Sequence, residues 1–136
     1  AASDVYKRQS NGISCDLIDL RTISPMDWEK IFFSVRKTGQ LLVLDTGSAN
    51  NSVAGEIIAR VSMECWTSLK AAPRRIAMPD IPVPTSVALT KGLYPGVVEI
   101  GQTIGQMLGI EIDIKELTRG ISKHHDVPGE WFQGPF

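Results

Sequence analysis

Two aspartates, Asp45 and Asp80, are the residues best placed to do chemistry in this sequence. Each follows a short apolar run typical of a buried strand, and the carboxyl ends of parallel strands form the edge where open α/β sheets hold ligands. There the two carboxylates could form an active-site wall or a metal pair. They could also be turn and cap residues that accept hydrogen bonds from loop amides, which is the interpretation we favour. Without His, Lys or Cys near them, they form no recognised catalytic set.

Other polar groups also fall short of a site. Glu56 stands near the start of a predicted helix, where it can support the first amides or pair with Arg60 one turn later. The adjacent His124 and His125 project in different directions, with no third ligand nearby. We therefore predict no catalytic, cofactor-binding or metal-binding residue in this chain.

Hydrophobic periodicity predicts alternating strands and helices that would hold these residues in place. The predicted strands are 13–20, 41–44 and 74–78, and the predicted helices are 25–38, 52–69 and 96–108. Apolar residues fall on both faces of the strands, which is typical of a parallel sheet covered on both sides. Three β–α repeats with short connections predict an α/β fold, a three-layer α/β/α sandwich with a mainly parallel sheet.

The helix predicted at 25–38 has start and stop signals in its sequence. Ser24 is the expected N-cap and Pro25 the expected first helical residue. Gly39 is the expected stop. One apolar face should pack on the sheet, and it consists of Trp28, Ile31, Phe32 and Val35.

The helix predicted at 96–108 carries Gly101 and Gly105 one turn apart. Because glycine is a poor helix former, its repeated use indicates a steric need. We expect this face to let another element approach closely, either in this chain or across a subunit interface.

The C-terminal segment differs from the rest of the chain. Isoleucines alternate with charged residues over 110–115, which predicts a strand-like or extended stretch. Beyond it the sequence is rich in Pro and Gly yet contains Trp131, Phe132 and Phe136. We predict that residues 110–136 form an extended arm whose aromatic side chains bury against a partner subunit or a neighbouring surface of this domain.

The bulk composition points to one soluble domain. The chain has 136 residues, 43% of them hydrophobic, and a net charge of −1 with the two signs interspersed. This charge gives no electrostatic footprint for nucleic acid or an anionic membrane, and no apolar run is long enough to span a bilayer. The two cysteines, Cys15 and Cys65, are expected to be reduced and buried.

Several short motifs resemble the C-terminal domain shared by transketolases and the β-type subunits of thiamine-diphosphate-dependent 2-oxo acid dehydrogenases. The run DLRTISPMD at 19–27 is the most distinctive of them. The others are LLVLD at 41–45, GEI at 55–57 with Ala59, AP at 72–73 with Arg75, DIPVP at 80–84 and LYP at 93–95. The chain resembles the β-type dehydrogenase subunit more than transketolase proper or deoxyxylulose-phosphate synthase.

The resemblance implies an organisation and a function. Residues 1–11 would be an unmatched leader and 12–109 the family domain, lacking the first strand and helix. This domain would support subunit association within a cytoplasmic or mitochondrial-matrix oxidoreductase, whose complete form transfers an acyl group to lipoamide. The implied partners are α-type and β-type subunits and the lipoyl acyltransferase core. Thiamine diphosphate and Mg would belong to the complete enzyme, and the isolated chain would be inactive.

Two alternatives remain open at this point. The chain could be part of a transketolase-type or synthase-type sugar enzyme, although no phosphate-binding Arg or His with a recognisable motif follows its predicted strands. It could also be a free-standing α/β binding module with the aromatic segment as its docking arm.

Overall fold

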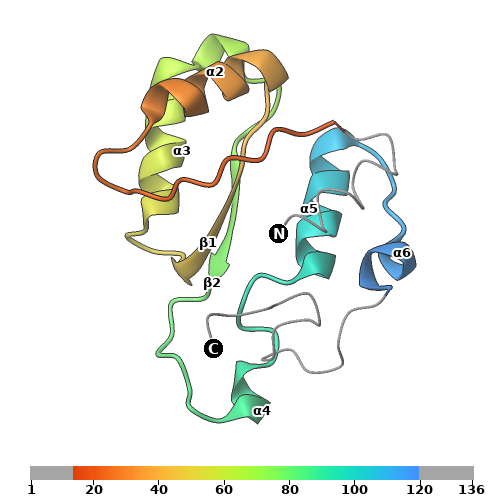
Figure 1. Ribbon diagram of the computed structural model, residues 1–136. Coiled ribbons are helices and arrows are strands. Elements are labelled where there is room, and N and C mark those ends of the chain that lie inside the picture. The colour runs from red at the N-terminus through yellow and green to blue at the C-terminus, as the bar shows by residue number, and fades with distance from the viewer. Residues whose placement is uncertain (1–13, 120–136) are drawn as a thin grey trace.

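The computed structural model describes residues 14–119 of the chain (Figure 1). In chain order the elements are helix α2 (Trp28–Thr38), strand β1 (Leu42–Ser48), helix α3 (Val53–Glu64), the 3-10 turn η1 (Trp66–Ser68), strand β2 (Arg74–Met78), and helices α4 (Val87–Thr90), α5 (Val97–Leu108) and α6 (Ile114–Thr118). Within these residues, no helix combines the length and apolarity needed to cross a membrane.

Strands β1 and β2 lie side by side and run in parallel, with α3 as the connection between them (Figure 1). Leu42 is opposite Arg74 and Leu44 is opposite Ile76, and the register then shifts before Ser48 meets Met78. The prediction of an α/β fold with parallel strands is confirmed. Strand β2 has the predicted bounds, whereas β1 extends beyond its predicted end at Leu44.

The strand predicted at 13–20 is wrong over the residues that the structure describes. Residues 14–20 form a coil, and the sheet formed by residues 14–119 has two strands rather than three. A strand exists only if its backbone joins a ladder, and an apolar run alone cannot supply the partner. Leu17, expected to be covered, is 55% exposed.

Helix α2 begins later than predicted. Its N-cap is Asp27, whose carboxylate accepts the backbone N–H of Lys30 at 3.2 Å, so Ser24 and Pro25 lie outside the helix. A carboxylate at this position also interacts favourably with the positive end of the helix dipole. The predicted stop is confirmed, because Gly39 adopts φ 77° and donates its N–H to the carbonyl of Val35 at 2.7 Å.

The main core lies between α2 and α3. On α2, Ile31, Phe32 and Val35 are buried, as predicted, while Trp28 is half-buried and stacks on Phe32 with ring centroids 5.8 Å apart. The buried residues that complete this cluster are Ile57, Val61 and Cys65. The apolar face of α2 therefore packs mainly on α3 and its C-cap, with Val43 of β1 at the margin of the cluster.

The chain after α5 turns back along that helix. Gly109 ends α5 with φ 66°, and the Ile110 N–H donates to the carbonyl of Gly105 at 3.0 Å. The strand-like pattern predicted for 110–115 is wrong at its end, because helix α6 starts at Ile114. Asp113 supports this start, because its side chain accepts the Lys115 N–H at 2.8 Å. Burial of Leu117 of α6 against α5 outweighs the preference of the alternating pattern for a strand.

The two glycines of α5 face this returning segment. A Cβ atom on Gly101 would collide with the Leu117 side chain of α6, and one on Gly105 would lie 2.8 Å from the carbonyl oxygen of Ile110. Leu117 itself is 4% exposed. The close approach therefore occurs within this chain, and a role of these glycines in subunit contacts stays a prediction.

Candidate functional site at the carboxyl ends of the strands

Asp80 joins the segment after β2 to the end of β1 and the loop that follows it. Its Oδ1 accepts the Ser48 hydroxyl and its Oδ2 accepts the Asn50 side-chain amide, both at 2.8 Å. The backbone adds a third link, because Ala49 donates its N–H to the carbonyl of Met78 at 2.7 Å. The two side-chain hydrogen bonds, first that from Asn50 and then that from Ser48, lower the pKa of Asp80 below its ordinary value.

Asp45 organises the same edge from β1. Its Oδ1 accepts the backbone N–H of Gly47 at 2.8 Å, and its Oδ2 accepts that of Ala54 in the first turn of α3 at 3.4 Å. Ser52, the N-cap of α3, accepts the N–H of Gly55. These contacts satisfy two of the amides that every helix start leaves without an intrahelical partner.

Asp45 therefore makes the contacts with backbone amides that we favoured from the sequence, whereas Asp80 does not. Asp45 bonds backbone amides and Asp80 bonds two side chains, so each holds a loop in place. Residues 14–119 contain no group of three or more His, Cys, Asp or Glu side chains that could hold a metal ion. The described part of this edge is thus organised as a support, and any chemical role for the two aspartates stays a prediction.

The loop between β1 and α3 contributes Asn50 and Asn51 in different ways. Asn50 donates to Asp80, while Asn51 adopts φ 50°, a left-handed conformation that asparagine tolerates better than most residues. Glu56 and Arg60 do not form an ion pair among the described residues. The Arg60 guanidinium lies instead over the Trp28 ring, 4.2 Å from its centroid.

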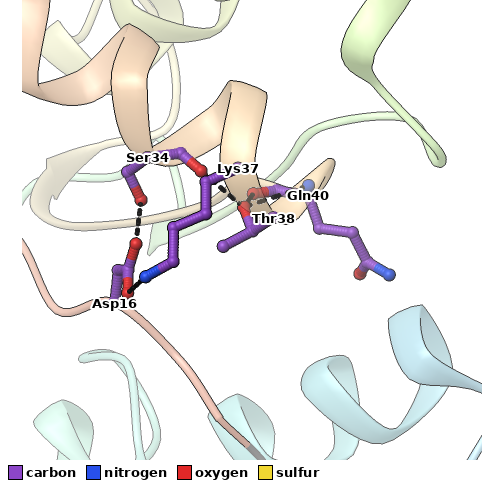
Figure 2. Close-up of polar contacts among 5 residues, drawn as sticks. All are labelled: Asp16, Ser34, Lys37, Thr38 and Gln40. Atoms are coloured by element: carbon purple, nitrogen blue, oxygen red, sulfur yellow. Dashed lines mark hydrogen bonds and ion pairs between the residues drawn. The ribbon is translucent and has the colours of Figure 1, made fainter.

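A polar cluster around Asp16, which the sequence did not reveal, fixes the coil before α2 (Figure 2). Its carboxylate accepts the Ser34 hydroxyl at 3.0 Å and pairs with the Lys37 ammonium at 2.9 Å. The hydrogen bond from Lys37, followed by that from Ser34, lowers the pKa of Asp16 below its ordinary value. Ser34 and Lys37 lie one turn apart on one helix face, and this spacing is the only sign of the cluster in the sequence.

The end of α2 is closed next to this cluster (Figure 2). The Thr38 hydroxyl donates to the carbonyl of Ser34 at 2.9 Å and accepts the backbone N–H of Gln40 at 3.4 Å. The remaining predicted residues, His124, His125 and the three aromatic residues of the arm (Trp131, Phe132 and Phe136), lie outside the described residues.

Comparison with known proteins places this geometry in a family. The model of the transketolase C-terminal domain family matches residues 1–100, so the match takes in the leader at 1–11. This covers well over half of the chain. The chain therefore belongs to the transketolase C-terminal domain family.

Three individual relatives show which members of the family the chain resembles, and all three are β subunits. The chain is 49% identical over 80 residues to the pyruvate dehydrogenase E1 component subunit beta of Mycoplasma pneumoniae, which covers 59% of this chain and 24% of the relative. It is 39% identical over 92 residues to the same subunit of Rhizobium meliloti, and this match covers 68% of this chain and 20% of the relative. It is 36% identical over 89 residues to the acetoin:2,6-dichlorophenolindophenol oxidoreductase subunit beta of Cupriavidus necator, covering 65% and 26%. The matched region thus spans about a quarter or less of these relatives.

Proposed function

We propose that this chain is the C-terminal domain of the β-type subunit in the decarboxylating component of a 2-oxo acid dehydrogenase, in the cytoplasm or the mitochondrial matrix. Its role there is to support subunit association, while the complete enzyme transfers the acyl group to lipoamide. The observation that carries this proposal is the 36–49% identity to β subunits, together with the match to the family model.

The geometry of the strand ends favours assembly over catalysis. Asp45 accepts hydrogen bonds from backbone amides, and Asp80 accepts them from Ser48 and Asn50. No His, Lys or Cys side chain within residues 14–119 bonds either carboxylate, so the arrangement matches no recognised catalytic set. The relatives add a second argument. The chain is similar both to proteins named for pyruvate dehydrogenase and to one named as an acetoin:2,6-dichlorophenolindophenol oxidoreductase subunit, which favours a shared structural role over substrate selection.

Thiamine diphosphate and Mg, which the family implies for the complete enzyme, do not fit the residues described here. Asn50 and Asn51 resemble the end of the motif that binds the diphosphate, but the upstream Gly-Asp-Gly is absent from this sequence. The side-chain amide of Asn50 is also engaged with Asp80. We therefore assign the cofactor to other parts of the complete enzyme and derive no step through it.

The proposed partners are α-type and β-type subunits, and in some members of the family the lipoyl acyltransferase core. The test is gel filtration with light scattering of the full 136-residue chain, alone and mixed with an α-type subunit encoded by the same genome. We expect the mixture to co-elute as a larger species. Separate elution under conditions where the authentic β subunit associates would contradict the assembly role and favour a free-standing module.

Calorimetry separates the enzymatic alternatives. The chain alone should bind neither thiamine diphosphate with Mg nor a pentose phosphate. Stoichiometric, magnesium-dependent cofactor binding would overturn our assignment of the cofactor to other parts of the enzyme. Saturable binding of the sugar phosphate would instead favour the transketolase-type alternative.

A further inference from the structure

The loop between β1 and α3 contains two adjacent asparagines that are held in different ways. Both are exposed, but the side-chain amide of Asn50 donates to Oδ2 of Asp80 at 2.8 Å, which fixes its orientation. Asn51 adopts φ 50°, and within residues 14–119 no hydrogen bond holds its side chain. Ser52 follows it as the N-cap of α3, outside the helix itself. Asn51 therefore carries an accessible, unrestrained amide beside a small residue.

An amide in this position can react with its own backbone, which is one reason why asparagine is a thermolabile residue. The backbone nitrogen of Ser52 bonds to Cγ of Asn51, the bond from Cγ to Nδ2 breaks, and Nδ2 leaves as ammonia with the proton of the Ser52 amide. Water then opens the resulting cyclic imide at either carbonyl carbon, which gives aspartate or isoaspartate. The reaction consumes only water, and a serine hinders the attack less than a larger or branched side chain does.

Asp80 opposes the same reaction at Asn50. The hydrogen bond to Asp80 holds the Asn50 amide in place, whereas Cγ must turn toward the backbone nitrogen of Asn51 before it can be attacked. Loss of the amide would also put a second carboxylate where the amide nitrogen now lies, 2.8 Å from the carboxylate of Asp80, and like charges at that distance repel each other. The residue that follows Asn50 is moreover larger than serine.

We propose that Asn51 is a site of spontaneous deamidation through an imide formed with Ser52, and that Asp80 restricts the reaction to this asparagine. The proposal does not depend on the proposed function, because it requires neither a cofactor nor a second subunit. Aspartate tolerates the left-handed conformation, so that product fits the loop. Isoaspartate instead adds a backbone carbon directly before Ser52, whose hydroxyl accepts the Gly55 N–H at 3.3 Å, and it therefore disturbs the start of α3.

Incubation of the full 136-residue chain at mildly alkaline pH, followed by tryptic mapping with mass spectrometry, tests the proposal. The sequence contains three asparagines, and cleavage after Arg21 and Lys37 separates Asn11 from Asn50 and Asn51. Asn11 precedes a glycine, the residue that hinders the attack least, so it serves as the internal control for the reaction conditions. We expect Asn51 to be converted several-fold faster than Asn50, with isoaspartate among the products.

The ratio of the conversion rates of Asn51 and Asn50 measures the protection by Asp80. In Asp80→Ala this ratio should fall toward its value in the urea-unfolded chain. In the matched control Asp19→Ala it should not change, because Asp19 pairs with Arg21 on the coil before α2. Circular dichroism checks that each variant is folded.

Three results would overturn the proposal. The first is an unmodified Asn51 in protein whose Asn11 has been converted. The second is a rate ratio that is the same in the folded and the urea-unfolded chain, a comparison that requires no variant. The third is a ratio in folded Asp80→Ala as high as in the parent protein, because Asp80 would then not protect Asn50.

Discussion

The guanidinium of Arg60 lies 4.2 Å from the centroid of the Trp28 ring, so a cation of α3 covers an aromatic side chain at the start of α2. Trp28 in turn stacks on Phe32, and the Arg36 guanidinium lies 5.7 Å from the Phe32 ring. The contact between Arg60 and Trp28 thus joins α3 to α2 beside their buried core, and the stacked rings of Trp28 and Phe32 lie between the two guanidinium groups. Each cation is attracted by the negative face of the ring that it covers.

Replacing Arg60 with Met should lower the free energy of unfolding by about 0.5–1 kcal/mol, the usual size of a cation–π contact near the surface. A double-mutant cycle with Trp28→Leu, measured by urea denaturation, isolates the pair. Arg60→Lys should retain part of the interaction. Additive effects of the two single changes would show that the two side chains are not coupled.

Replacing Phe32 with Ala should cost about 3–5 kcal/mol, because it empties a site between α2 and α3 where the side chain is 7% exposed. The neighbouring Phe33 is the matched control. It is 70% exposed, so Phe33→Ala should change stability by no more than about 0.5 kcal/mol. Equal effects of the two changes in chemical denaturation would mean that the buried face of α2 is wrongly assigned.

The Asp16 cluster should make the protein less stable in acid. Because Lys37 and Ser34 hold the pKa of Asp16 below its ordinary 3.8, the unfolded chain binds the proton more tightly than the folded one. The stabilisation is therefore present above the ordinary pKa and is lost as the pH falls through the folded value.

Asp16→Asn should reduce the loss of thermal stability on acidification below about pH 4. Asp19→Asn is the control, since Asp19 is largely exposed and, within residues 14–119, forms an ion pair only with Arg21, at 3.6 Å. Thermal melts from pH 7 to pH 2 compare the variants. An acid dependence in Asp16→Asn as steep as in the parent would exclude a stabilising role of this carboxylate.

The contact between Gly101 and Leu117 predicts that the effect of Gly101→Ala on stability changes sign when the Leu117 side chain is shortened. In the parent protein, Gly101→Ala should destabilise by about 1–3 kcal/mol, because the new Cβ collides with Leu117. In a Leu117→Ala background the collision disappears, and the same change should stabilise by up to about 1 kcal/mol through helix propensity.

Denaturant unfolding of the parent, the two single variants and the double variant measures the free energies of unfolding for this cycle. Gly105→Ala offers a comparison, because its Cβ would meet the backbone carbonyl of Ile110, which cannot move aside as a side chain can. It should therefore stay destabilising in both backgrounds. If Gly101→Ala raises stability in the parent protein, α6 does not pack on α5 in this way.

Local sequence signals predicted most of the fold. Strand β2 and the stop of α2 at Gly39 were predicted correctly, because a run of apolar residues and a glycine that can adopt a left-handed conformation are signals contained within a few residues. The strand at 13–20 failed because an apolar pattern does not reveal whether a neighbouring strand exists. Helix α6 was missed because its stability comes from Leu117 packing on α5 rather than from its own five residues.

In the candidate site, too, local features could be predicted from the sequence and contacts between distant residues could not. The sequence correctly located Asp80 just beyond β2, but it also placed Asp45 after the end of a strand, whereas Asp45 lies within β1. It could not show that Asp80 bonds Ser48 and Asn50, which lie 32 and 30 residues away in the chain. The pairing of Asp16 with Ser34 and Lys37 spans 18 and 21 residues and was missed for the same reason.

The two-stranded sheet has a consequence for handling this protein. Within residues 14–119 each strand has one neighbour, so each leaves one row of backbone N–H and C=O groups without a ladder partner. Strand β2 begins with Arg74 and Arg75, whose charges oppose edge-to-edge association, whereas β1 offers the uncharged run Leu42–Leu44. Self-association at high concentration should therefore begin along β1, as strand addition between molecules, and solvents that compete for backbone hydrogen bonds should reverse it.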